Sequence, residues 1–268
     1  MTEIKLLLSD VDGTLVRRDK SLAPSTVDAV RALHDAGIHF AVTSGRPPRG
    51  MEMLVEPLAI RAPLAGFNGG LVVEPDLDVL EEHLIPDEIV SRAVALLEWS
   101  ELSVWVYRGA DWLVRDADGP HVDRESHTVQ FEPTVVGSFD DVSTGVAKIV
   151  GVSDDFDAVA AAERAAHDEF GDHLSASRSQ PYYLDITHPQ ANKGAVVTYL
   201  SERYQLRPDE IATIGDMPND VLMFAHSGLS IAMGNAHREV QRAARQVTST
   251  NDEDGFAHAV DRYILGRS

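Results

Sequence analysis

The 268-residue chain contains no cysteine, which excludes disulfide bonds and metal sites built from thiolates. It is also poor in basic residues, with 23 Lys and Arg against 43 Asp and Glu and a formal net charge of -20. Nucleic acids and anionic membranes bind basic surfaces, so this balance argues against either as a partner. Small anionic substrates stay possible, because a local cation can override the overall sign of the charge.

Long apolar runs are missing as well, and none approaches the length that spans a bilayer. The first residues lead directly into an apolar stretch, without the basic and apolar regions of a signal peptide. A hydrophobic content of 44% with 25% charged residues is typical of a soluble globular protein. We therefore expect a cytoplasmic protein, whose length suggests one large domain or two smaller ones.

Both outer thirds of the chain alternate apolar strands with amphipathic helices. Residues 4–10 have the pattern of a buried strand, and residues 25–37 that of a helix with Ser25 as its N-cap. Continuous apolar strands between such helices predict an α/β fold with a doubly wound, Rossmann-like parallel sheet. The other expected elements are strands at 38–45, 62–70, 210–216 and 229–235 and helices at 192–204 and 220–228.

The middle of the chain has a different pattern. Its strands alternate polar and apolar residues, residues 157–170 form an alanine-rich helix, and all three tryptophans lie here. We expect an inserted α+β cap domain at 82–186. The core domain is then discontinuous, formed by 1–81 and 187–268, and its sheet is expected to resume near residues 182–187.

Polar residues follow four of the predicted core strands. Ligands bind beyond the carboxyl ends of the strands in open α/β sheets, so we expect these residues to converge at one edge. They are Asp10 and Asp12, then Thr43, Ser44, Gly45 and Arg46, then Asn68, and finally Asp216, Asn219 and Asp220, with Lys193 at the start of a helix.

This set of side chains indicates a cation and a phosphate group. Several carboxylates crowded into a low-dielectric crevice repel each other and need a divalent ion. Carboxylate oxygens with no His or Cys in these motifs select a hard ion, with Mg²⁺ first. Such an ion is coordinated by carboxylates and by a substrate phosphate at the same time. The phosphate would be bound by Ser44, the Gly45 amide, Lys193 and Asn219.

Taken singly, each motif has an ordinary structural explanation: a lone Asp-x-Asp is usually a turn, and a lone lysine is usually solvated. Their order and their positions on strand ends make that explanation poor for the set. The strings "DVDGTL" at 10–15, "TSGR" at 43–46, "NKG" at 192–194 and "GDMPND" at 215–220 resemble the four motifs of the haloacid dehalogenase superfamily.

Within that superfamily, the chain is similar to the Cof-type branch. The similarity rests on the large cap inserted between the second and third motifs, together with "FNGG" after the third strand and "AMGNA" near the end. The resemblance implies a Mg²⁺-dependent phosphatase that acts on a sugar phosphate or another small phosphate ester.

The resemblance also implies a role for each motif residue. Asp10 would be the nucleophile that forms an aspartyl-phosphate and binds Mg²⁺, and Asp12 the general acid and base, which offers its backbone carbonyl to the metal. Asp216 would be the third metal contact, with Asp220 orienting it from behind. The phosphate would be held by the Val11 backbone, Ser44, Gly45, Lys193 and Asn219, with Thr43, Arg46 and Asn68 in support.

Two other functions stay open at this point: a phosphomutase that uses the same aspartyl-phosphate, and a regulator that binds a sugar phosphate without turnover. Intact carboxylates make the regulator the weakest of the three. Sugar phosphates, pyridoxal phosphate and riboflavin-pathway phosphates are all possible substrates, and the oligomeric state is open. Candidate cap residues for reading the leaving group are Trp105, Tyr107, Arg108, His121, His127 and Arg178.

Overall fold

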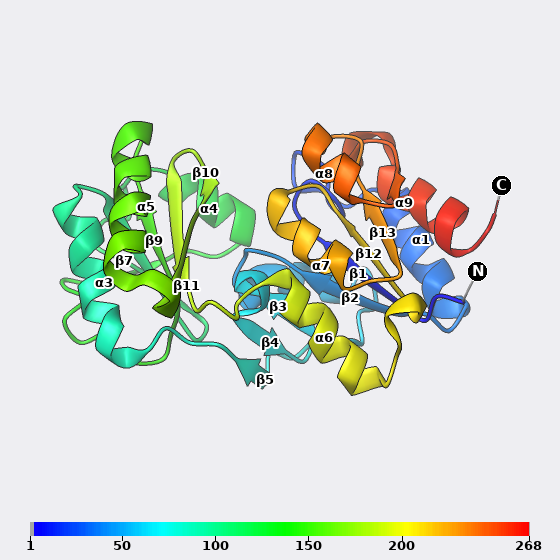
Figure 1. The fold of residues 1–268 in the computed structure, drawn as a ribbon, viewed down its shortest axis with the longest axis horizontal. Coiled ribbons are helices and arrows are strands. Elements are labelled where there is room, and N and C mark those ends of the chain that lie inside the picture. Colours follow the sequence, from blue (N-terminus) through cyan, green and yellow to red (C-terminus); the bar gives the residue numbers. More distant parts are fainter. Residues whose placement is uncertain (1–2, 268) are drawn as a thin grey trace.

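The protein is organised around two β-sheets that lie in separate lobes (Figure 1). A computed structural model describes residues 3–267. Within them, the larger sheet has the strand order β14-β13-β12-β1-β2-β3-β4-β5, and the smaller one β10-β11-β9-β6-β7-β8. The larger sheet belongs to the lobe formed by both outer thirds of the chain, which we call the core. The other lobe, formed by the middle of the chain, is the cap.

The core contains eight strands and two sets of helices. The strands are β1 (Leu6–Asp10), β2 (His39–Thr43), β3 (Leu64–Gly66), β4 (Leu71–Val73), β5 (Val79–Glu82), β12 (Ile211–Gly215), β13 (Leu229–Ala232) and β14 (Gln246–Val247). The helices are α1 (Pro24–Asp35), α2 (Glu52–Val55), α6 (Lys193–Tyr204), α7 (Val221–Ala225), α8 (Arg238–Ala243) and α9 (Gly255–Ala259).

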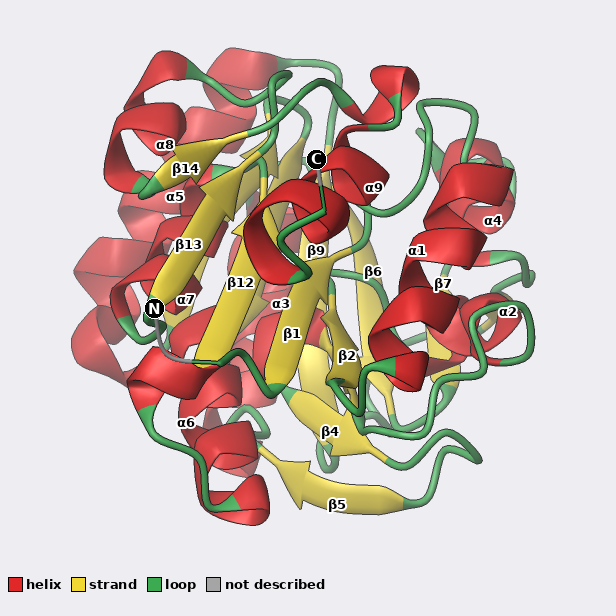
Figure 2. Ribbon diagram, turned by 90° about the vertical axis from the view of Figure 1, so that its right-hand side faces the viewer, coloured by secondary structure: helices red, strands yellow, loops and turns green. Residues whose placement is uncertain are grey.

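Strand β1 lies in the middle of the core sheet, parallel to β12 on one side and to β2 on the other. Leu7 packs on the face covered by α1 and α9, whereas Leu6 and Leu8 pack on the face covered by α6, α7 and α8 (Figure 2). Burial on both faces explains why the strand is apolar at successive positions. The predicted doubly wound parallel core is confirmed.

Two antiparallel strands, β4 and β5, extend this sheet beyond its parallel part. The chain reverses between β3 and β4 at Asn68 and Gly69, both of which have positive φ. Residues 62–70, predicted as a single strand, therefore divide into β3, a short turn of 3₁₀ helix and the reversal.

The cap is a six-stranded sheet with two helices on its outer face and a third on the side of the core. Its strands are β6 (Ser103–Arg108), β7 (Asp111–Val114), β8 (Thr134–Val135), β9 (Val146–Val152), β10 (Ser175–Gln180) and β11 (Tyr183–Thr187). Its helices are α3 (Asp87–Trp99), α4 (Val122–Val129) and α5 (Phe156–Phe170). Helices α3 and α5 bury the outer face of the sheet, while the inner face is turned toward the core (Figure 1).

The prediction that the core sheet resumes at 182–187 is wrong. These residues form β11, which pairs with β9 and β10 of the cap. Leu184 and Ile186 belong to the apolar cluster of the cap, and β11 lies against α5, which assigns the strand to that lobe. The core sheet resumes only at β12.

The N-cap prediction for the first helix is also wrong. Helix α1 begins at Pro24, with Ala23 as N-cap. The Ser25 hydroxyl instead donates a hydrogen bond to Asp254 Oδ1 at 2.7 Å. Helix α6 begins as its sequence suggests, because the side chain of Asn192 caps it by accepting a hydrogen bond from the amide of Ala195.

Two short connections join the lobes, from β5 to α3 and from β11 to α6. His83 of the first and His188 of the second stack with ring centroids 5.7 Å apart, so the connections lie side by side. The core sheet extends to Glu82, and the last cap strand ends at Thr187. The division into 1–81, 82–186 and 187–268 stays a prediction.

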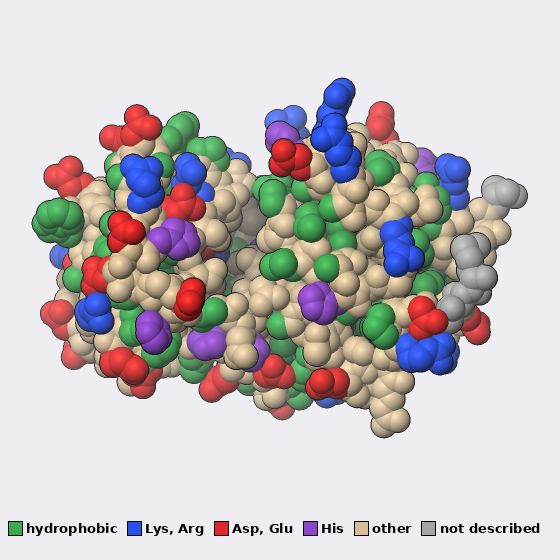
Figure 3. All heavy atoms as spheres, viewed as in Figure 1, with side chains coloured by type: hydrophobic (Ala, Val, Ile, Leu, Met, Phe, Trp, Pro, Cys, Tyr) green, Lys and Arg blue, Asp and Glu red, His purple; other side chains and the backbone are tan. Residues whose placement is uncertain are grey.

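The lobes are in contact next to a hollow on the surface between them (Figure 3). Phe67 of the core packs on Tyr107 of the cap with ring centroids 5.2 Å apart. Helix α4 lies on the 3₁₀ turn Pro48–Met51, where a Cβ on Gly50 would come within 3.0 Å of Val129. Across residues 3–267, none of the helices has both the length and the apolar character of a bilayer-spanning segment.

Candidate active site

Three aspartates meet at the carboxyl end of the core sheet. Asp10 is the last residue of β1, and Asp216 and Asp220 follow the adjacent strand β12, so parallel pairing brings them together. One oxygen of each lies within 4.8 Å of the others, and all three side chains are buried. Such a cluster of like charges is unfavourable without a cation.

Lys193 supplies one cation from the first turn of α6. Its Nζ lies 2.5 Å from Asp10 Oδ1 and 2.6 Å from Asp220 Oδ1, and its side chain is 1% exposed. The two carboxylates raise the pKa of Lys193 despite its burial, so it stays charged. Lys193, predicted from the sequence to lie at this edge of the sheet, is therefore among the most buried residues of the described chain.

The two oxygens of Asp220 are already occupied. Oδ1 accepts from Lys193, and Oδ2 accepts from the amides of Asp216 and Met217, both at 2.8 Å. Asp220 thus fixes the loop after β12 and the position of Lys193. This arrangement suits the supporting role inferred for Asp220 better than that of a metal ligand.

Asp216 is held by side chains from the loops that follow β1 and β13. Thr14 donates a hydrogen bond to its Oδ1 at 3.1 Å, and Asn235 donates to its Oδ2 at 3.2 Å. A Cβ on Gly13, which has a φ of 84°, would come within 2.4 Å of Asp216 Oδ2. Glycine is therefore required at this position for both its backbone conformation and its lack of a side chain.

Asp10 differs from its neighbours because half of its carboxylate has no partner. Its Oδ2 is buried and has no hydrogen bond within residues 3–267. Burial raises the pKa of Asp10, and the charges of Asp220 and Asp216 add to this effect while Lys193 opposes it. A buried, unpaired carboxylate oxygen is costly unless another group binds it.

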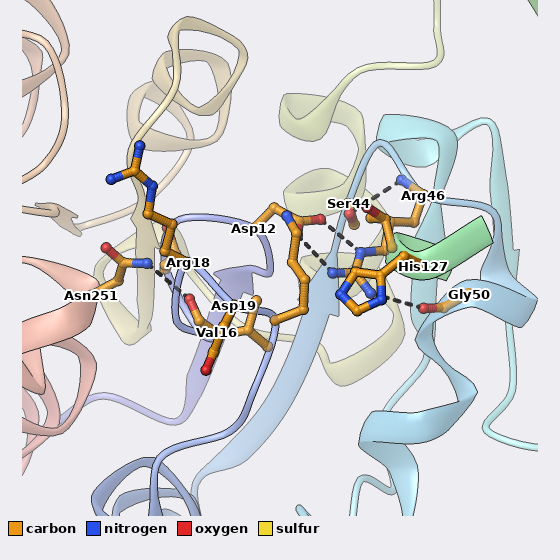
Figure 4. A network of polar contacts seen from close by, with 12 residues as sticks. Asp12, Val16, Arg18, Asp19, Ser44, Arg46, Gly50, His127 and Asn251 are labelled. Carbon is orange, nitrogen blue, oxygen red and sulfur yellow. Dashed lines mark hydrogen bonds and ion pairs between the residues drawn. The ribbon is translucent and has the colours of Figure 1, made fainter. Parts of the chain in front are cut away.

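Asp12 points away from this cluster. Arg46 Nε lies 2.7 Å from its Oδ2 and Arg46 Nη2 lies 2.6 Å from its Oδ1, a bidentate pair (Figure 4). Lys20 Nζ lies 2.6 Å from the same Oδ1. Burial alone would raise the pKa of Asp12, but these two cations outweigh it and lower the pKa to about 2.

The remaining residues predicted to hold phosphate lie at the same sheet edge. Thr43 ends β2 directly opposite Asp10, and Ser44 and Gly45 follow it. The Thr43 hydroxyl is buried and has no partner among the described residues. Asn219 donates to Asn68 Oδ1 at 3.0 Å, which joins two predicted motifs that are far apart in sequence.

The backbone at Val11 is the last member of the predicted phosphate-binding set. Its carbonyl accepts from the amides of Leu15 at 3.0 Å and Val16 at 3.1 Å, so the loop after β1 is tightly wound. The phosphate-binding and catalytic roles of all these residues stay predictions.

Three residues of the site were not predicted from the sequence. Thr14 and Asn235 lie inside the quoted strings "DVDGTL" and "AMGNA", so those motifs carried a signal for them. Lys20 belongs to a loop eight residues after Asp12, and nothing in the local sequence indicates that it returns to the carboxylate.

The comparison with family models decides the identity of the fold and its motifs. The model of the haloacid dehalogenase-like hydrolases matches residues 7–260. The chain belongs to the haloacid dehalogenase-like hydrolases. The resemblance inferred from the four motifs, with its Cof-type cap, is thereby confirmed.

The individual relatives of this haloacid dehalogenase-like hydrolase are phosphatases by name. A Haemophilus influenzae protein named as a phosphatase is 31% identical over 254 residues, covering 94% of this chain and 95% of its own length. A Bacillus subtilis relative, named 5-amino-6-(5-phospho-D-ribitylamino)uracil phosphatase, is 25% identical and covers 98% of both chains.

The solved structures agree with the sequence comparisons. A haloacid dehalogenase-like hydrolase from Bacteroides thetaiotaomicron superposes with a TM-score of 0.90 at 28% identity. The match covers 97% of this chain and 99% of that one. The protein is therefore a phosphatase whose core and cap both have counterparts in its family.

We expect Asp216→Asn to stabilise the metal-free protein at pH 7. Burial and the charge of Asp220 raise the pKa of Asp216 to about 6. The folded state binds the proton of the Asp216 carboxyl group more tightly than the unfolded state does. Ionisation of Asp216 therefore lowers the free energy of unfolding as the pH rises from 3.8 to about 6, and this loss is complete at pH 7. Removing the charge should add about 1–2 kcal/mol to the free energy of unfolding, allowing for the weakened contact with Asn235.

Asp220→Asn is the matched control, since it makes the same substitution in the same cluster. It should destabilise the protein, because Asp220 accepts three hydrogen bonds. Denaturant unfolding of both variants in EDTA, at pH 5 and pH 7, measures the difference. Equal destabilisation by the two substitutions would contradict the inference that the charge of Asp216 destabilises the folded protein.

Proposed function

We propose that this phosphatase hydrolyses a small organic phosphate monoester with the help of Mg²⁺, through an aspartyl-phosphate on Asp10. The observation that carries the proposal is the state of Asp10. One of its oxygens is held by a charged lysine, while the other is buried, unpaired within the described residues and directed into a cluster of oxygen ligands. A nucleophile requires a free oxygen and a fixed orientation, and Asp10 has both.

The side chains present suit a divalent cation. Asp10 and Asp216 supply carboxylate oxygens, and the donor set contains no nitrogen or sulfur ligand, which favours a hard ion such as Mg²⁺. Asp10, Asp216 and the backbone carbonyl of Asp12 would hold the ion. When bound, it would neutralise the carboxylates and the phosphate oxygens that repel them.

The two steps of the reaction use different residues of the chain. Asp10 Oδ2 attacks phosphorus, and the bond from phosphorus to the leaving alcohol breaks. Lys193, Ser44, Asn219 and the backbone amides after β1 and β2 would bind the phosphate oxygens as their charge is redistributed. Water then attacks the aspartyl-phosphate, which releases inorganic phosphate and restores Asp10.

Asp12 would transfer a proton in both steps, and for the first step it must be protonated although its ion pairs favour the ionised form. The pair with Arg46 and Lys20 keeps Asp12 ionised in the free protein, so it is ready to accept a proton from water. To protonate the leaving alcohol it must first take up a proton. Binding of the substrate is therefore expected to weaken the contacts of Asp12 with Arg46 and Lys20.

Removal of the metal should abolish activity. We expect phosphate release from a panel of sugar phosphates and p-nitrophenyl phosphate to stop in excess EDTA and to return with Mg²⁺. Ca²⁺ should restore it poorly, because its larger and looser coordination shell would misplace Asp10 and the phosphate.

The assay separates the parts of this proposal. Full activity in excess EDTA would refute the role of the metal, and the absence of phosphate release from every ester would refute hydrolysis of small monoesters. Acid-quenched enzyme from the Mg²⁺ assay should carry covalent phosphate, and its absence in a burst experiment would refute the aspartyl-phosphate.

A further inference from the structure

The two connections between the lobes meet at a pair of stacked histidines. Residues 83–86 lead from β5 to α3, and residues 188–192 lead from β11 to α6 (Figure 1). The rings of His83 and His188 have centroids 5.7 Å apart and planes 18° apart. Any rotation of one lobe against the other changes the geometry of both connections, so the stack lies at the hinge between the lobes.

The first connection is fixed to the core. The amide of His83 donates a hydrogen bond to the carbonyl of Gly70 at 2.8 Å. Its ring nitrogen Nε2 lies 2.9 Å from Glu81 Oε1, and the side chain is 19% exposed. His83 therefore presents a ring of fixed position to the second connection.

The second connection is a tight turn whose first residue is held by its own side chain. The amide of Gln190 donates to His188 Nδ1 at 3.1 Å, and the amide of Ala191 donates to the His188 carbonyl at 2.9 Å. An imidazole nitrogen that accepts a hydrogen bond carries no proton. His188 is therefore neutral in this arrangement, with its proton on Nε2.

The end of the turn sets the position of Lys193. Asn192 caps α6, because its Oδ1 accepts from the amide of Ala195 at 3.0 Å, and its own amide donates to the carbonyl of Gln190 at 2.9 Å. Lys193 follows as the first residue of α6, and its Nζ binds Asp10. The turn thus joins the hinge to the lysine that holds the nucleophile.

The surroundings of His188 disfavour a proton on its ring. The charged or titratable side chains on the elements next to it are Glu81 and Glu82 of β5, His83, and Lys148 and Asp185 of β9 and β11. Glu81 pairs with His83 and Asp185 with Lys148, so both carboxylates have other partners. Burial lowers the pKa of His188, and the charge of His83 lowers it further.

The stacked arrangement is therefore weakened by acid. A protonated His188 can no longer accept the hydrogen bond from Gln190, and its charge lies against that of His83. Because the stacked arrangement binds this proton less tightly than a released one, the released arrangement gains as the pH falls below 6.5, the ordinary pKa of histidine. Two unit charges 5.7 Å apart repel in water by an amount that corresponds to about 3-fold in an equilibrium constant.

We propose that the stack of His83 on His188 fastens the hinge and positions Lys193, and that protonation releases the stack in acid. His188 is then a positioning residue, which acts through the turn 188–192 and through Lys193. The inference rests on the proposed role of Lys193 in binding phosphate. It adds a pH dependence that belongs to the hinge and is separate from that of the catalytic carboxylates.

The test begins with two substitutions of His188 at pH 7.5. The side-chain oxygen of asparagine can accept the hydrogen bond from the amide two residues on but does not titrate, whereas alanine has no acceptor. His188→Asn should therefore keep kcat/KM for p-nitrophenyl phosphate within about 3-fold of wild type. His188→Ala should lower it about 3- to 10-fold, as expected for one lost hydrogen bond.

The pH dependence is the decisive readout. The ratio of kcat/KM of His188→Asn to that of wild type should rise at least about 3-fold from pH 7.5 to pH 5.5. Titration of the ester and of the catalytic carboxylates affects both proteins alike, so it cancels in the ratio. His226→Asn is the matched control. It removes another histidine next to the first turn of α6, at Gly194, and should give a constant ratio.

Hydrogen exchange provides a readout that does not depend on activity. After correction for the intrinsic exchange rate, protection of the Gln190 amide should fall in wild type between pH 7.5 and pH 5.5 and stay constant in His188→Asn. His83→Phe keeps a ring in the stack but removes one charge, so its protection should fall less than that of wild type.

The outcomes distinguish this inference from the proposed function. A constant activity ratio together with constant protection of Gln190 in wild type would refute release of the stack in acid. A fall in protection without a change in the activity ratio would refute the positioning of Lys193. If none of the proteins releases phosphate from the ester, the proposed function fails, while hydrogen exchange still decides whether acid releases the stack.

Discussion

Asp10→Asn should reduce phosphate release by at least about 10⁴-fold with every ester, because no other group can replace the attacking oxygen. Asp12→Ala should behave differently. It removes proton transfer and the ion pairs with Arg46 and Lys20 but leaves the attacking oxygen of Asp10 in place, so a sugar phosphate should react about 10²–10⁴-fold more slowly. The loss should be much smaller with p-nitrophenyl phosphate, whose leaving group departs without a proton.

An acid-quench experiment distinguishes the two aspartates further. Asp12→Ala with p-nitrophenyl phosphate should accumulate phosphoenzyme, because the water that hydrolyses it has lost its base. Asp10→Asn should accumulate none. Phosphoenzyme in Asp10→Asn and its absence in Asp12→Ala would mean that the two roles are reversed. The geometry argues against this outcome, since the oxygens of Asp12 are paired with Arg46 and Lys20 while Asp10 Oδ2 is unpaired within the described part of the chain.

Lys193→Met should cause a large loss of both stability and activity. The substitution leaves Asp10 and Asp220 buried without their cation, and breaking a buried pair in this way costs about 3–5 kcal/mol. Loss of a charge next to the phosphate should lower kcat by about 10²–10³-fold. Urea unfolding in EDTA and phosphate release in Mg²⁺ measure the two effects separately.

Two further variants serve as controls for the effect of Lys193→Met on stability. Lys5→Met breaks an ion pair with Glu210 whose lysine is 51% exposed, and it should cost about 1 kcal/mol or less. Adding Asp220→Asn to Lys193→Met should cost less than the sum of the two single changes, with a coupling of about 1–3 kcal/mol. Strict additivity would contradict a direct interaction between Lys193 and Asp220.

The parts of the site that the sequence predicted are those that topology brings together. Asp10 and Asp216 follow strands whose apolar runs identify them, and parallel neighbours place their carboxyl ends at one edge. The motif strings then supplied Thr43, Asn68 and Lys193. These residues are close in space because of the order of the strands, and no precise side-chain geometry was needed to group them.

The features that the sequence did not predict depend on contacts between residues that leave no pattern in the local sequence. The pattern of residues 182–187 identifies a strand but not the sheet that it joins, which is decided by pairing with β9 and β10 and by burial in the apolar cluster of the cap. The ion pair between Lys20 and Asp12 depends on particular side-chain positions. The same holds for the start of α1, where Ala23 and not Ser25 is the N-cap.

The position of β1 between β2 and β12 has a consequence for the order of folding. Leu6 pairs with Ile211, so the first strand lacks one neighbour until more than three quarters of the chain has been synthesised. The cap, in contrast, is a continuous segment with its own apolar cluster and more local pairings, which favours its early formation. The long intervening segment adds little closure cost, because each doubling of loop length costs only about 0.6 kcal/mol. During translation the catalytic edge is therefore completed last, after the lobe that covers it.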